Sequence, residues 1–171
     1  PRRRPRPPPR RPPPRRLPAR PRPRPPRRPR LPPPPPAPEQ TDWTAVLTAL
    51  YERRAAAFST GDASLLDRVH TADSPLLAAD RAYLASLTAA GEVLRGYRPT
   101  VTEVTLAAAP AGGGQVQVRL LDGWPGYSVV PADDPGGPAL RSEPGRPRTP
   151  VAMTLVPGPD GWLIGSAGRL S

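Results

Sequence analysis

The first 38 residues limit what this chain can fold into, because they are almost entirely proline and arginine. They contain 20 prolines and 14 arginines, with only two leucines and two alanines among them. Proline removes backbone donors and repeated arginines repel one another, so we expect a disordered, extended arm with polyproline II character. The part that can bury a core is therefore residues 39–171, which is enough chain for one domain.

Charge divides at the same boundary. The chain has 25 basic and 14 acidic residues, and a formal net charge of +11. Every acidic residue follows residue 38, together with 11 arginines, so the arm carries +14 and the domain −3. Three interpretations of the arm stay open: a linker without a specific partner, an electrostatic tether that contacts anionic lipid or nucleic acid, and a ligand for a polyproline-binding domain. The high basicity is a property of the arm alone.

Composition excludes several kinds of site. The chain has no cysteine, which excludes disulfides, thiolate nucleophiles and cysteine-ligated metal centres. His70 is the sole histidine, so a multi-histidine metal site or a nucleophilic triad would need unusual substitutes, and we expect His70 at the surface or at a pocket rim. The adjacent Asp133 and Asp134 are expected to be solvated in a loop rather than to bind a cation. We expect no metal and no cofactor.

No apolar run approaches the roughly 18 residues that span a bilayer. The chain begins at Pro1 rather than at methionine, so an upstream targeting segment stays open. We expect a soluble domain that is extracytoplasmic or membrane-associated if such a segment exists, and cytoplasmic otherwise.

After the arm, the pattern predicts three helical segments. Thr41 or Asp42 can cap a helix over 43–58, and glycine follows its end. A short helix over 62–69 comes next. A third helix is predicted over 75–90. It opens with a serine–proline pair and is followed by glycine, and both are typical signals of helix ends.

The remainder changes to the two-residue period of half-buried strands. The predicted strands are 101–106, 115–120, 127–130, 151–156 and 162–164. Between the third and fourth of these, residues 131–150 are rich in proline and glycine. A distorted hairpin at a sheet edge is favoured there over a mobile flap. Helices followed by strands indicate an α+β fold with an antiparallel sheet.

Two charged residues lie inside predicted apolar helix faces. On a helical wheel Arg54 falls about 20° from Trp43 on the first helix, and Asp80 falls about 40° from Leu76 on the third. Burying either charge alone would cost several kcal/mol, so we expect Arg54 and Asp80 to form an ion pair across the helices. A paired carboxylate is a poor base, which favours a structural role for the pair over acid/base chemistry.

The order of elements resembles the nuclear transport factor 2-like (NTF2-like) cone fold. The resemblance rests on Trp43 opening the first helix, on the run RRAAAFSTGD at 53–62, and on Ser74, Pro75 and Asp80 at the start of the third helix. It looks most like the uncharacterised actinobacterial branch of the superfamily and covers nearly all of the domain. The resemblance implies N-terminal helices packed on a curved antiparallel sheet, as in a cone or cystatin-like roll, with a conical pocket.

What the resemblance implies about function is broad, because this superfamily includes ketosteroid isomerases, polyketide cyclases and an epoxide hydrolase, but also transport factors and modules without chemistry. Its actinobacterial members are often tethered to the envelope through an upstream membrane segment and a proline-rich stretch, a role that the arm would suit. A small apolar ligand and a second copy of the chain, forming a homodimer, are the expected partners.

Three functional hypotheses follow. The favoured one is a non-enzymatic binding or accessory module on a disordered linker, associated with the envelope if an upstream segment exists. The alternative is a small-molecule isomerase, cyclase or hydrolase with Asp80 as base and Tyr51 or Tyr83 as donor, in which His70 is a further candidate. The third is an anionic-polymer or membrane tether acting through the arm. An Asp80 held by Arg54 would argue against the enzyme.

Overall fold

The computed structural model describes residues 41–108 and 114–170. Within these ranges the chain forms three helical segments followed by seven strands, which is the predicted α+β class. The arm predicted over residues 1–38 lies outside the described residues, so its linker and tether interpretations stay predictions. Across the two described ranges, no helix combines the length and hydropathy needed to cross a membrane.

The first helix, α1 (Trp43–Thr60), begins and ends at the residues that the sequence marks. The Asp42 side chain accepts a hydrogen bond from the backbone N–H of Ala45 at 3.0 Å, and so satisfies a free amide of the first turn. Gly61 ends the helix in the left-handed region, with φ of 77°, where a residue without Cβ is favoured.

The other two helical segments also follow their predicted caps. A short 3₁₀ helix, η2 (Ala63–Arg68), starts after Asp62, whose side chain accepts from the N–H of Ser64. The helix α2 (Pro75–Ala89) starts after Ser74, with proline at its first position. Both predicted segments are confirmed, although η2 is tighter than an α-helix.

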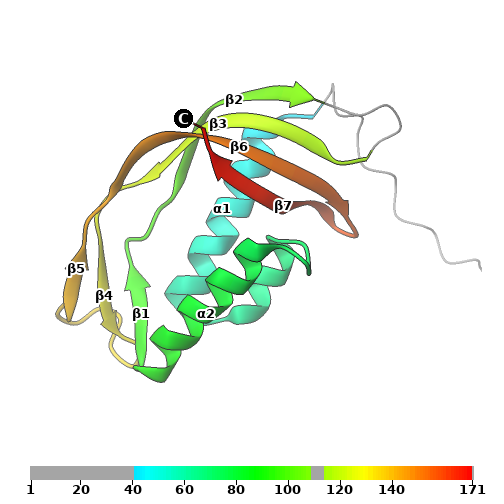
Figure 1. Cartoon of the computed structure of the whole chain (residues 1–171). Helices are drawn as coiled ribbons and strands as arrows, with labels where there is room; N and C mark the ends of the chain where they lie inside the picture. The colour runs from blue at the N-terminus through cyan, green and yellow to red at the C-terminus, as the bar shows by residue number, and fades with distance from the viewer. Residues whose placement is uncertain (1–40, 109–113, 171) are drawn as a thin grey trace, which may run out of the picture. The chain divides into compact units, whose positions relative to one another are not determined.

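The seven strands form two antiparallel sheets that continue into one another. The strands are β1 (Glu92–Arg95), β2 (Thr100–Ala108), β3 (Val116–Trp124), β4 (Tyr127–Pro131), β5 (Arg141–Glu143), β6 (Arg146–Gly158) and β7 (Gly161–Arg169). One sheet has the order β2-β3-β6-β7 and the other β1-β4-β5. Because β3 leads directly into β4, and β5 into β6, the two sheets make one bent surface that curves around α1 and α2 (Figure 1).

The proline-rich segment 131–150 contains the edge hairpin that the sequence favours. Arg141–Glu143 pairs with β4 at the outer edge of the three-stranded sheet, where missing donors are tolerated. The predicted start of the next strand is wrong, however. β6 begins at Arg146 rather than at Val151, because Pro147 falls at a register shift and Pro150 pairs opposite Leu121 without interrupting the ladder.

β1 is missing from the sequence-based prediction. Its four residues are too few to display the two-residue alternation, and it directly follows Gly91 at the end of α2. It pairs with β4, and so closes the end of the sheet that covers α2.

Two apolar clusters hold the helices to the sheet. One joins the first half of α1 to the four-stranded sheet and includes Leu47, Leu50 and Leu155. The other joins the last turns of α1 to α2, β1 and β4, and includes Phe58, Leu84 and other buried side chains. Each fully buried side chain of this size contributes about 1.5–3 kcal/mol, so the two clusters supply the main driving force for this packing. Charged side chains also lie between the helices and the sheet, where they line a pocket.

Candidate functional site

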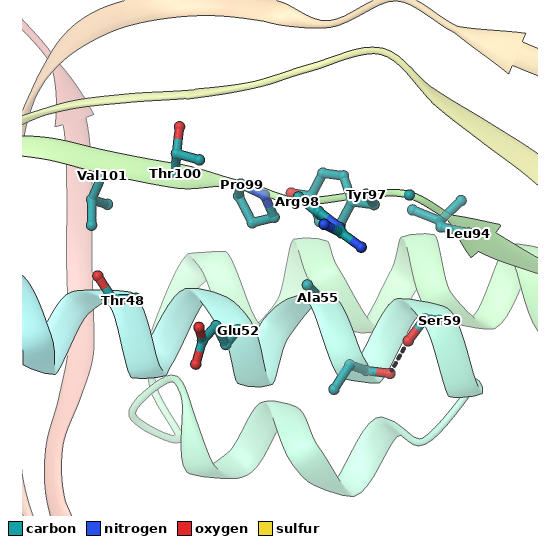
Figure 2. Close-up of a pocket in the computed structure, with 12 residues that line it drawn as sticks. Thr48, Glu52, Ala55, Ser59, Leu94, Tyr97, Arg98, Pro99, Thr100 and Val101 are labelled. Atoms are coloured by element: carbon teal, nitrogen blue, oxygen red, sulfur yellow. Dashed lines mark hydrogen bonds between the residues drawn. The ribbon is translucent and has the colours of Figure 1, made fainter.

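The hollows that the described residues form include a groove and a pocket, each large enough to hold a small molecule. The larger is a groove of about 660 Å³ between α1 and the segment 94–101. Figure 2 shows Pro99 and Val101 directed toward the helix, opposite Thr48 and Ala55. The two charged residues of the groove, Glu52 and Arg98, are exposed, and neither forms an ion pair with any residue that the structure describes. The groove is therefore a surface feature with few fixed polar groups.

The smaller hollow is a pocket of about 270 Å³ between the helices and the inner face of the sheet. Its lining residues come from α1, the turn after η2, α2, β3, β6 and β7: Tyr51, Arg54, His70, Leu76, Asp80, Asp122, Trp124, Arg146, Val151, Met153, Ile164, Ala167, Gly168 and Arg169. It corresponds to the conical pocket that the resemblance implies. It also holds every charged residue that the helical wheels place on an apolar face.

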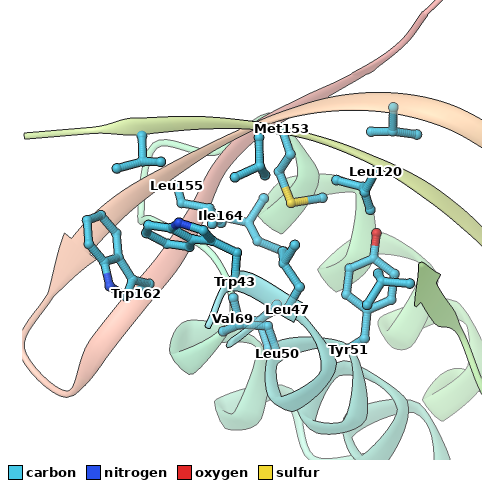
Figure 3. Packing of buried hydrophobic residues seen from close by; sticks show 14 residues of the cluster. Trp43, Leu47, Leu50, Tyr51, Val69, Leu120, Met153, Leu155, Trp162 and Ile164 are labelled. Atoms are coloured by element: carbon cyan, nitrogen blue, oxygen red, sulfur yellow. The ribbon is translucent and has the colours of Figure 1, made fainter. Parts of the chain in front are cut away.

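The apolar wall of the pocket comes from the sheet. Val151 and Met153 lie on β6, and Ala167 on β7 pairs directly opposite Met153. Figure 3 shows Met153 between the sheet and the side chains of α1, with Tyr51 projecting from the helix toward the sheet. The inner face of the sheet thus gives the pocket an apolar wall, beside the charged residues that the same sheet contributes.

The first charged group of the pocket is centred on Asp80, whose side chain is only 9% exposed. Arg54 donates two hydrogen bonds to it, from Nε to Oδ2 at 2.6 Å and from Nη2 to Oδ1 at 2.7 Å. His70 Nε2 lies 2.9 Å from the same Oδ2, and because a carboxylate only accepts, Nε2 is the donor. The remaining Nη1 of Arg54 donates to the Tyr97 hydroxyl. Both oxygens of Asp80 are occupied.

These contacts determine the ionisation states of Asp80 and Arg54. Burial by itself raises the pKa of Asp80, but the hydrogen bonds from Arg54 and His70 outweigh it and hold that pKa below its usual value. Burial likewise lowers the pKa of Arg54, while the hydrogen bond to Asp80 and the neighbouring Tyr97 raise it above its usual value. Near neutral pH the two side chains are therefore a carboxylate and a guanidinium ion, joined in bidentate geometry.

The second charged group is centred on Asp122, a buried residue of β3. The Tyr51 hydroxyl donates to its Oδ2 at 3.0 Å, and Arg146 Nη2 donates to its Oδ1. The Arg146 guanidinium also lies over the ring of Trp124, 4.0 Å from the ring centroid, in a cation–π contact. Burial, followed by the charge of Asp122, raises the pKa of Tyr51, so its hydroxyl stays a donor.

The structure brings together some of the residues that the sequence singles out. Arg54 and Asp80 are in contact, and Tyr51 and His70 line the same pocket. His70 was expected at the surface or at a pocket rim; it lines the pocket but is buried, at 3% exposed, so the surface alternative is wrong. Its segment turns inward because the backbone at residues 69–71 hydrogen-bonds to Ile164 on β7, a contact between distant parts of the chain.

Tyr83 does not belong to the pocket. Its side chain is 40% exposed and packs against Phe58, with ring centroids 5.5 Å apart. The expectation that Tyr83 is a donor in the pocket or part of the core is therefore wrong. Tyr83 lies at the edge of the apolar face of α2, where it is partly exposed and next to Tyr127 on β4.

The sequence analysis missed Asp122 and Arg146. A signal for Asp122 was present, because Val116, Val118 and Leu120 alternate inward on β3 and Asp122 is the next residue on that face. For Arg146 there was none, since it lies among prolines and glycines in a segment predicted as a hairpin. Its position depends on the pairing of residue 146 with Trp124.

The described ranges contain no cluster of three or more histidine, aspartate or glutamate side chains arranged to hold a metal ion. Two atoms of the pocket residues are buried without a hydrogen-bond partner in the same ranges, namely His70 Nδ1 and Arg146 Nε. Such unpaired groups are uncommon in folded proteins and each requires an explanation.

The comparisons with known proteins concern the fold. No protein-family model and no curated protein matches the chain. Among solved structures, the intermembrane space region of the chloroplast protein ARC6 is similar, with a TM-score of 0.50 and 16% identity, over 75% of this chain and 96% of that one. Kfla4162 from Kribbella flavida has a TM-score of 0.46 at 17% identity, covering 73% and 87% of the two chains. Aln2 from a Streptomyces species has 0.45 at 18%, covering 79% and 92%.

Proposed function

We propose that this domain, which has the fold of the NTF2-like superfamily, is a non-enzymatic module that binds a small molecule in the pocket between its helices and its sheet. The observation that carries the proposal is that both carboxylates of the pocket have each oxygen occupied. Asp80 accepts from Arg54 and His70, and Asp122 accepts from Tyr51 and Arg146. A carboxylate that is already neutralised by an arginine is a weak base, so neither is suited to take a proton from a substrate.

The enzyme alternative would require one of these carboxylates to exchange a partner for substrate. For Asp80 that means breaking a bidentate contact with Arg54, and the pKa of Asp80 is already lowered, which makes it a weak base. The observation in favour of this alternative is that Asp80, His70 and Tyr51 line one pocket, which is how acid/base residues gather. It ranks second because each carboxylate of the pocket is already paired with an arginine.

The pocket volume limits the ligand. Ordinary ligand pockets measure about 300–1,000 Å³, and this one, at about 270 Å³, lies just below that range. An apolar cavity of about 150 Å³ holds a benzene molecule, so 270 Å³ accommodates one ring with a short substituent. The expected ligand is a small, partly apolar molecule.

The sheet offers a matched pair of variants to test the binding site. Ala167 lines the pocket, so Ala167→Phe fills it. Ser166 lies on the same strand, is exposed and is not among the lining residues. Ser166→Phe therefore adds the same side chain to the same strand at a position outside the pocket lining.

We expect benzyl alcohol, phenylacetamide or phenylacetate to shift the amide resonances of pocket residues in the full chain and in Ser166→Phe, and to leave those of Ala167→Phe unchanged. Equal shifts in the two variants would place binding elsewhere and reject the proposal. The carboxyl ¹³C resonance of Asp80 then separates binding from catalysis. If the bound ligand raised the pKa of Asp80 toward neutral pH, Arg54 would have released it and the enzyme alternative would replace ours.

The further parts of the functional hypothesis remain predictions. A linker or tether role for residues 1–38, a homodimer and an association with the envelope each rest on the sequence and on the resemblance. The binding proposal depends on none of them, because the pocket is formed within residues 41–170.

A further inference from the structure

The pocket has hydrogen-bond donors to spare, and each of its carboxylate oxygens already accepts at least one hydrogen bond. The four oxygens of Asp80 and Asp122 take hydrogen bonds from Arg54, His70, Tyr51 and Arg146. A ligand that brings only donors would have to share these oxygens with the protein. A ligand that brings acceptors would not compete with any of these contacts.

Arg146 supplies the clearest unused donor. Its Nη2 donates to Asp122, but its Nε is buried and has no partner among the residues described. The guanidinium lies over the Trp124 ring and donates to Asp122, so its position is restricted before a ligand arrives. An unpaired N–H of a charged group is unfavourable in a protein interior, and a ligand oxygen would relieve that penalty.

Arg169 adds a second positive charge to the same pocket. It pairs with Val151 across β6 and β7, on the face where Val151 and Met153 line the pocket. Its side chain is exposed and forms no ion pair within the described part of the chain. Counting Arg54, the pocket holds three guanidinium groups against two carboxylates, which leaves one positive charge in excess before His70 is considered.

We propose that the ligand of this pocket is a small organic anion, with a carboxylate that binds Arg146 and an apolar body that packs on Val151, Met153 and Ile164. This inference rests on the proposed binding function and names the ligand class of the same site. A planar guanidinium binds a carboxylate through two parallel N–H donors, which gives orientation as well as attraction. Arg169 contributes attraction from the more exposed side of the pocket, where salt screens it.

Phenylacetate and phenylacetamide make a matched pair of probes, because they share a ring and a methylene and differ in the charge of the head group. The arm's 14 arginines will also attract anions, so bulk binding cannot report on the pocket. The measurement is therefore the amide resonances of residues 151–153 and 164–169 in the full 171-residue chain, at about 150 mM salt.

We expect phenylacetate to bind about tenfold more tightly than phenylacetamide at the pocket resonances. Arg146→Gln should remove most of that preference, and Arg146→Lys should keep part of it, since lysine keeps the charge but not the planar fork. Arg169→Gln, which breaks no ion pair, should weaken phenylacetate by a smaller factor, and less so in higher salt. Arg148→Gln removes an exposed charge from the same strand and should have no effect.

The outcomes separate the two proposals. If both probes bind equally and Ala167→Phe abolishes both, the pocket binds small molecules but the anion inference is wrong. If neither probe shifts the pocket resonances, the proposed function itself fails with this inference. If Arg146→Gln does not fold, Arg169→Gln provides the test of charge. An unchanged preference for phenylacetate over phenylacetamide in Arg169→Gln, with an unchanged salt dependence, would also contradict the proposed role of charge.

Discussion

The pocket and the groove along α1 differ in size, but the more informative difference lies in their charged residues. The groove is more than twice as large, at about 660 Å³ against about 270 Å³, yet its charged residues Glu52 and Arg98 are exposed and unpaired within the described ranges. The pocket holds two aspartates fixed by arginines, and a third arginine with no carboxylate. Fixed polar groups that are shielded from water interact strongly with a ligand, whereas the interactions of exposed charges are screened by water. The pocket is therefore the better candidate site.

The largest difference between the two hollows should appear in stability. Asp80→Ala leaves Arg54 and His70 without their acceptor in a mostly buried position, and should lower the free energy of unfolding by about 3–5 kcal/mol. In the groove, Glu52→Ala should change it by no more than about 0.5 kcal/mol. Urea unfolding of the full chain, followed by circular dichroism, measures both.

Asp80→Asn covers the case in which the alanine variant does not fold. It keeps the size of the side chain and one acceptor oxygen, so its loss of stability should fall between those of Asp80→Ala and Glu52→Ala. If the two Asp80 variants lost no more unfolding free energy than Glu52→Ala, the ion pair of the pocket would contribute no more to stability than a surface charge does.

A smaller effect is expected from Tyr51→Phe. The change removes the donor to Asp122 Oδ2 and leaves a buried carboxylate oxygen unpaired, which should cost about 1–3 kcal/mol. Tyr83→Phe is the matched control, because that hydroxyl is on a 40% exposed residue and water can replace its contacts, so a change within about 0.5 kcal/mol is expected. Thermal unfolding of both variants makes the comparison, and equal losses would contradict a fixed role for Tyr51.

The smallest expected effect is on the pH dependence of folding stability. The pKa of Asp80 is lowered in the folded protein, so below about pH 4 the unfolded chain takes up a proton that the folded chain does not. Asp80 therefore contributes stability that is full above that pH and is lost as the pH falls toward its folded pKa, by at most about 1.4 kcal/mol per pH unit.

Urea unfolding between about pH 5 and pH 2 should show a slope that is shallower in Asp80→Asn than in the wild type. Glu52→Gln provides the control from the groove and should keep the wild-type slope. If Asp80→Asn keeps the same slope as the wild type, the lowered pKa of Asp80 does not contribute to folding stability.

Much of the fold could be predicted because its signals are local. The caps at Asp42 and Ser74 and the left-handed Gly61 act within a few residues, so the helices begin and end where the sequence indicates. β1 was missed because four residues carry no clear period. The early start of β6 was missed because Pro147 and Pro150 suggest a loop, and only the partner strand shows that they are tolerated.

The candidate site was predictable only in part. Arg54 and Asp80 stand out because a charge on an apolar helix face needs a partner, and Asp122 could have been found by extending the alternation of β3 by one residue. His70 and Arg146 could not. One is buried by a bridge to Ile164, and the other is placed by its pairing with Trp124, and both contacts join residues far apart in the sequence.

The sequence by itself therefore determined the class of the fold, the ends of its helices and the need for Arg54 to meet a carboxylate, because each depends on neighbours within a turn or a strand. The tertiary structure alone decided that two charged groups share one pocket, that each oxygen of their carboxylates already accepts a hydrogen bond and that Arg146 keeps a buried N–H without a partner among the described residues. The physical reason is that hydrogen bonds are satisfied in space rather than along the chain. Which donors remain free depends on how the bent sheet closes over the helices (Figure 1).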